Sequence, residues 1–125
     1  MSQVESILDV LYRLQTEGGD GNFAIFTVNE EKNYYLQVSA QAGATQLYCE
    51  AVGDAYLKPE NKLNPEQYLG LIRYGWVRTA GNYTFIEEVH SPETRQSLAD
   101  FIHKTLTTVY GLNPQAELDV ELILE

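Results

Sequence analysis

Apolar residues recur along the first part of the chain at the spacing of one helical face. The residues in this pattern are Val4, Ile7, Leu8, Leu11 and Leu14. Ser2 followed by Glu5 fits a capping box, in which each side chain satisfies a free amide of the first helical turn. We therefore predict a helix that ends by Glu17, because the glycine-rich segment 18–21 cannot sustain it.

The pattern then changes to a period of two, which is typical of strands. Short aromatic and β-branched runs at 23–28, 34–40 and 45–52 are separated by turn-forming segments. In the second and third runs one set of alternate positions is apolar, whereas the other set is polar and contains tyrosines. This alternation indicates an antiparallel sheet that is covered on one side only.

Two further helices are marked by capping residues followed by proline. Asn64 and Pro65 begin a short helix that ends near Gly75, and Ser91 begins the longest helix, which Gly111 closes. A hairpin of strands at 76–78 and 83–89 lies between these helices. After Pro114 the chain alternates again, so a last strand is predicted. Apolar residues at 118, 120, 122 and 124 alternate with acidic residues at 119, 121 and 125.

These elements predict an α+β fold with an antiparallel sheet and helices packed on one side. The order is α-β-β-β-α-β-β-α, followed by the C-terminal strand, and short turns rather than helical crossovers join the strands. We expect residues 1–125 to form a single domain, with a core at 1–112 and an acidic strand or extension at 113–125.

Charge narrows the classes of partner. The 125 residues include 8 basic and 18 acidic side chains, for a formal net charge of −10. This balance disfavours nucleic acid and anionic membrane surfaces, since both attract a basic face. The chain has no apolar run long enough to cross a bilayer and no basic, apolar start typical of a secretory signal, so we expect a cytoplasmic protein.

The reactive side chains form no recognisable catalytic or metal-binding motif. His90 and His103 lack the spacing of a metal site, and Cys49 falls on the apolar side of a strand. We therefore predict no catalytic residue, no metal and no cofactor. An enzyme would need one of these histidines beside a carboxylate in a cleft.

Aromatic residues are the prominent feature, with nine tyrosines and one tryptophan. Because tyrosine and tryptophan concentrate at contact surfaces, the candidate partner-binding residues are Tyr35, Tyr48, Tyr83 and Trp76. The three tyrosines fall where the pattern predicts the open face or edge of the sheet. The alternative is that these side chains shield the sheet or complete the core.

The second half of the chain resembles a known family. Segment 63–67 leads through Leu71 to Gly75-Trp76, a hairpin carries 81–85, and the last helix ends in the sequence of residues 105–112. This arrangement resembles the TY-Chap domains, stand-alone bacterial relatives of the type III secretion chaperones, over residues 1–112. In those proteins a helix leads into Gly-Trp, and the last helix ends near Leu-x-x-Val-Tyr/Phe-Gly.

The resemblance implies a non-enzymatic, chaperone-like domain. Relatives hold a partner polypeptide on the sheet and helix surface, often as homodimers, so we expect a protein partner and a homodimer, for which stacking of two open sheet faces is one arrangement. Only Gly75 and Trp76 match a motif, in which their role is structural. An alternative from another class is a small-molecule-binding domain, with a pocket between the sheet and the third helix. Inward-facing polar groups such as Thr105 or Gln37 would support that alternative.

Overall fold

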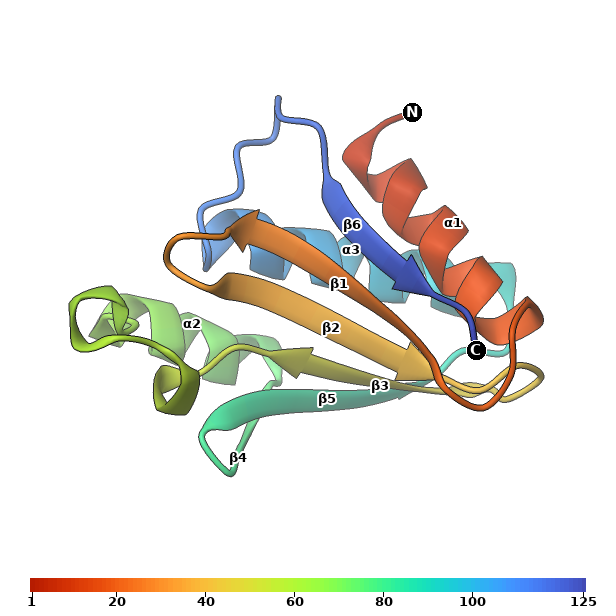
Figure 1. The fold of residues 1–125 in the computed structure, drawn as a ribbon, viewed down its shortest axis with the longest axis horizontal. Coiled ribbons are helices and arrows are strands. Elements are labelled where there is room, and N and C mark those ends of the chain that lie inside the picture. Colours follow the sequence, from red (N-terminus) through yellow and green to blue (C-terminus); the bar gives the residue numbers. More distant parts are fainter.

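The computed structural model describes residues 1–125. It contains three helices and a six-stranded sheet, with the elements in the predicted order (Figure 1). The helices are α1 (Gln3–Thr16), α2 (Pro65–Tyr74) and α3 (Pro92–Thr108). The strands are β1 (Asn22–Asn29), β2 (Tyr34–Ala40), β3 (Gln46–Ala51), β4 (Val77–Thr79), β5 (Asn82–Glu88) and β6 (Asp119–Ile123). Two 3₁₀ turns, η1 (Asp54–Tyr56) and η2 (Pro59–Asn61), lie between β3 and α2. The α+β class and the C-terminal strand are thereby confirmed.

The strands form one antiparallel sheet in the order β4-β5-β3-β2-β1-β6. Helices α1 and α3 contact each other, and α3 lies behind the sheet in Figure 1. Both helices cover the same face, because their buried residues belong to one core with those of the sheet. Helix α2 lies beside the C-terminal end of α3, where the Gln67 side chain donates a hydrogen bond to the Val109 carbonyl at 2.9 Å.

Local sequence determines where the helices begin and end. The predicted capping box of Ser2 and Glu5 is present, and Asn64 with Gln67 forms an equivalent box at the start of α2. Helix α2 ends at Gly75, whose φ of 104° lies in the left-handed region that favours glycine. None of the helices combines the length and the apolar character needed to cross a membrane.

The core lies between the sheet and the α1–α3 pair. Alternate residues of β2 are buried, as predicted, and they face the buried positions of α1 and α3. Helix α1 buries more than the predicted stripe, because Val10 is also in the core, and α3 buries Leu98, Ile102 and Leu106. Each of these helices packs against both the other helix and the sheet, and two contact directions require a wider apolar face than one.

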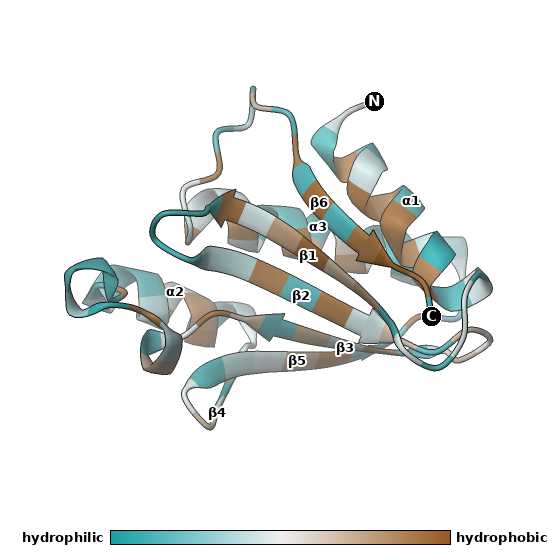
Figure 2. Cartoon of the chain, in the orientation of Figure 1, coloured by the Kyte–Doolittle hydropathy of each residue, from teal (hydrophilic) through white to brown (hydrophobic).

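The C-terminal strand β6 pairs with β1, and its hydropathy alternates along the strand in Figure 2. Asn22 secures this edge of the sheet. Its side-chain amide donates to the carbonyls of Leu14 at 2.9 Å and Glu17 at 2.6 Å. Its side-chain oxygen accepts from the backbone amides of Gly19 at 3.1 Å and Glu125 at 3.0 Å. One buried carboxamide therefore joins the end of α1, the start of β1 and the end of the chain.

Candidate functional site

One face of the sheet is left uncovered by the helices, and we call it the open face (Figure 1). The strand register brings five of its side chains into a single row across β6, β1, β2, β3 and β5, namely Ile123, Phe23, Ser39, Tyr48 and Ile86. Tyr48 is 37% exposed and Ile86 is 54% exposed. All but Ser39 are large hydrophobic or aromatic residues, so we call this set the apolar row.

The charged side chains that the strands place on the open face are all acidic. Glu50 and Glu121 belong to the row next to the apolar row, and Asp119 and Glu88 lie farther along β6 and β5. Strands β1, β2, β3, β5 and β6 contain no lysine or arginine. The open face therefore combines apolar side chains with a negative electrostatic potential.

Two of the predicted partner-binding residues, Tyr35 and Tyr48, lie on the open face. Tyr35 is half-buried opposite Thr27, and Tyr48 lies opposite Ser39. Burial raises the pKa of both tyrosine hydroxyls, and the nearby carboxylate of Glu50 raises both pKa values further. Both hydroxyls are therefore protonated at neutral pH and can donate hydrogen bonds.

The other two predicted residues, Trp76 and Tyr83, lie in the core. Trp76 is 2% exposed, donates its indole N–H to the Thr105 hydroxyl at 3.1 Å and stacks on Phe101 with ring centroids 5.3 Å apart. Tyr83 is 6% exposed and pairs with the fully buried Ala51 on a strand inside the sheet, so its predicted place on the open face or edge was wrong. The strand register decides this, because it gives Tyr83 and Ala51 the same, covered side.

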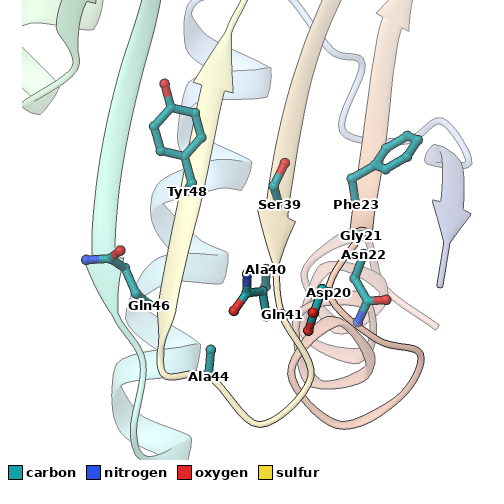
Figure 3. A pocket seen from close by; sticks show the side chains of 10 residues that line it. All are labelled: Asp20, Gly21, Asn22, Phe23, Ser39, Ala40, Gln41, Ala44, Gln46 and Tyr48. Carbon is teal, nitrogen blue, oxygen red and sulfur yellow. The ribbon is translucent and has the colours of Figure 1, made fainter. Parts of the chain in front are cut away.

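A shallow hollow lies at one end of the open face, over β1, β2 and β3 (Figure 3). Its volume is about 480 Å³, and the lining residues are Asp20, Gly21, Asn22, Phe23, Ser39, Ala40, Gln41, Ala44, Gln46 and Tyr48. In Figure 3 Ser39 lies between Tyr48 and Phe23, while Gln41, Gln46 and Asp20 lie toward the loops. The hollow therefore has an aromatic end and a polar, acidic end.

The predicted alternatives find less support in the geometry. Gln37 pairs with Ile25 and Glu50 on the open face, whereas Thr105 is buried under the other face, so they do not line a common pocket. His103 contacts the side-chain oxygen of Gln3 at 2.8 Å rather than a carboxylate. Cys49 is buried, and burial raises the pKa of its thiol to about 12. A nucleophile needs the opposite shift.

Residues 5–123 match the family model TY-Chap3, described as the T3SS (YopN, CesT) and YbjN peptide-binding chaperone 3. The chain belongs to this family. No curated protein and no solved structure matches it.

The TY-Chap3 match extends the earlier resemblance, which covered residues 1–112, into the C-terminal strand. The whole of strand β6 lies within the matched residues, which end at Ile123. This strand contributes Ile123 to the apolar row. Gly75 and Trp76, the two motif residues, have structural positions, since Gly75 ends α2 and Trp76 packs in the core. Because the family is described as peptide-binding, the open face is the candidate surface for a peptide.

Sequence reasoning missed Phe23, Ser39 and Ile86 as members of the surface around Tyr48. The alternation along 23–28 could have placed Phe23 on the face opposite Ala24 and Phe26. The position of Ser39 between two aromatic residues could not be found in this way, because it depends on the register of three strands. That register is set by packing across the whole sheet.

Proposed function

We propose that this TY-Chap3 domain is a non-enzymatic, chaperone-like module that holds an extended segment of a partner polypeptide across its open face. The observation that carries the proposal is the apolar row, which crosses five strands and is not covered by any helix. Contiguous exposed apolar surface on a soluble domain is a common mark of a binding site.

The dimensions of the row fit a short extended segment. Neighbouring strands lie about 4.8 Å apart, so five strands span roughly 19 Å, which is the length of about six extended residues. Alternate side chains of such a segment point toward the sheet. About three partner side chains therefore contact the row, and the others face solvent or the acidic groups around it.

The acidic side chains also favour reversible binding of one segment over indiscriminate clustering. An apolar surface surrounded by like charges repels a second copy of itself, because two such faces bring carboxylates together. Glu50, Glu88 and Glu121 would face their counterparts in a face-to-face pair. This supports a peptide rather than a second open face as the occupant.

The experiment is selection of peptides from a random display library on the immobilised domain, followed by calorimetry with the enriched sequences. Tyr48→Ala and Ile86→Ala remove exposed parts of the row, and Tyr56→Ala is the matched control, since Tyr56 is exposed in η1. We expect each row variant to weaken binding at least about fivefold, a typical effect for a contact aromatic, and the control to bind normally. Enriched peptides that bind the row variants as tightly as the parent protein would contradict the proposal.

We also propose that the domain forms a homodimer through α2 rather than through the open face. Leu69 and Ile72 lie on α2 with exposed side chains. Pairing through this surface leaves the open face free for a partner. Light scattering should show a dimer that Ile72→Asp converts to a monomer, while Ile86→Asp leaves the dimer unchanged. A monomeric parent protein would refute the dimer alone.

A further inference from the structure

The apolar row contains a gap at its centre, because Ser39 is small and its neighbours on both sides are aromatic. Ser39 pairs directly with Phe23 of β1 and with Tyr48 of β3. The two flanking strands are therefore roughly 10 Å apart, which leaves space for one inserted side chain over Ser39. Figure 3 shows Ser39 between Tyr48 and Phe23, with both rings pointing away from it, so the space over Ser39 is open. We call this feature the aromatic slot.

The floor and the far end of the hollow are polar. Gln41 and Gln46 place amide groups there, and Asp20 adds a carboxylate from the turn that precedes β1. A purely aliphatic side chain filling this space would cover those groups without giving them hydrogen bonds, which is unfavourable. The lining instead suits a side chain with an apolar stem and a hydrogen-bond-donating end.

No cation of the protein occupies this position. The strands that line the hollow contain no lysine or arginine, and Arg13, the basic residue near the end of α1, forms an ion pair with Glu17 at 3.1 Å. Arg78 of β4 pairs with Tyr83, on the covered side of the sheet. The carboxylates of Asp20, Glu50 and Glu88 near the slot thus have no basic strand residue to neutralise them.

We propose that the aromatic slot receives a lysine or arginine side chain of the partner segment, so that the domain selects basic, apolar peptides. This inference rests on the proposed function and names its substrate class. The alkyl stem of the inserted residue lies between Phe23 and Tyr48, over Ser39. Its cationic end reaches the polar end of the hollow, where it can pair with the carboxylate of Asp20.

The test measures fluorescence anisotropy with three labelled peptides of equal length and the same apolar residues. In the first peptide the variable positions are lysine and arginine, in the second they are glutamine, and in the third they are glutamate. The basic peptide should bind at least roughly tenfold more tightly than the neutral one, as expected when the stem packs beside the aromatic residues and the cation forms a charge-assisted hydrogen bond with a carboxylate. The acidic peptide should bind most weakly.

Variants separate the slot from general apolar binding. Tyr48→Leu retains apolar bulk and removes a ring, and Asp20→Asn removes a charge, so each should weaken basic-peptide binding roughly fivefold while changing neutral-peptide binding less than about twofold. Ser39→Leu fills the slot and should have the same effect. Tyr56→Leu is the matched control for loss of an exposed ring elsewhere.

The outcomes are distinguishable. Equal binding of the basic and neutral peptides, or equal losses for both peptides in Tyr48→Leu, overturns the slot and leaves peptide binding on the open face intact. Failure of all three peptides, together with an unenriched display library, overturns both the slot and the proposed function. Circular dichroism of each variant checks that the fold is retained.

Discussion

At the residue scale, Asn22 is the polar side chain on which the fold depends most directly. It is buried, and its carboxamide is bonded to backbone groups of α1, the turn after it and the end of the chain. Such a group is costly to disturb, since a buried polar atom without a partner loses its hydration and gains nothing in return. Its role is to hold three segments, not to act on a partner.

Asn22→Asp should destabilise the protein by about 3 kcal/mol, because a carboxylate oxygen would then face the carbonyls of Leu14 and Glu17 in place of the amide donor. Urea unfolding followed by circular dichroism measures the change. Asn113→Asp is the control, since Asn113 is exposed and its side-chain oxygen accepts a bond from the Gln115 amide. Equal stabilities for the two variants would refute the role assigned to Asn22.

Cys49 should resist thiol reagents in the folded protein near pH 8 and react rapidly once the protein is unfolded. Burial raises the pKa of its thiol from 9.0 to about 12, so the folded thiol stays protonated. The unfolded chain ionises first as pH rises, and Cys49 therefore lowers the stability progressively between about pH 9 and pH 12, with no effect below. Labelling rates, and unfolding midpoints of the parent and Cys49→Ala across this range, measure both effects. Rapid labelling of the native protein would contradict the prediction.

At the scale of the elements, β6 has two faces with different tasks. Leu122 packs against the core, whereas its neighbour Ile123 pairs with Phe23 on the open face. The strand therefore contributes to stability on one side and to the candidate binding surface on the other. Adjacent positions of one strand can be used to separate these contributions.

Leu122→Ala should destabilise the fold by about 2 kcal/mol, because it removes apolar contacts from the core edge. Ile123→Ala should cost less than about 0.5 kcal/mol in stability and should weaken binding of peptides selected on the parent protein. Urea unfolding and calorimetry on the same two variants give both quantities. The reverse order of stability losses would show that the faces of β6 are assigned incorrectly.

The helices, most strand positions and the α+β class follow from local signals such as the Ser2, Asn64 and Ser91 caps. The side of the sheet on which Tyr83 lies could not be predicted from local signals, because β5 carries aromatic or apolar residues on both sides. Tyr83 and Phe85 lie on one side and Ile86 lies on the other. A pattern of that kind does not indicate which side of the strand faces the core. Gln15 and Asn22 were also missed as buried polar residues, since their partners Val89 and Glu125 are distant in sequence. The slot at Ser39 depends on register for the same reason.

At the scale of the whole molecule, the net charge of −10 acts before any contact forms. An acidic domain attracts a basic segment over distances set by the salt concentration, and this attraction changes the association rate more than the dissociation rate. Because the five longer strands contain no basic residues, the electrostatic potential over the open face is negative as well.

The association rate of the basic peptide should fall at least about tenfold between 0.01 M and 0.15 M salt, over which the screening length falls from ~30 Å to ~8 Å. The dissociation rate should change by less than about threefold. Stopped-flow fluorescence measures both rates, with the neutral peptide as control. A salt-independent association rate would contradict long-range attraction.

The position of β1 between β2 and β6 has a consequence for how the protein is made. On the ribosome, β1 emerges early and finds β2 at once, but its other partner is encoded at the end of the matched region. Through most of synthesis β1 therefore presents an unpaired edge, the kind of surface on which nascent chains associate wrongly. The second edge of β1 becomes paired only when the last strand, β6, has left the exit tunnel. A chain terminated before β6 would therefore keep the unpaired edge of β1 exposed, and we expect aggregation and proteolytic degradation of such a chain to begin at this edge.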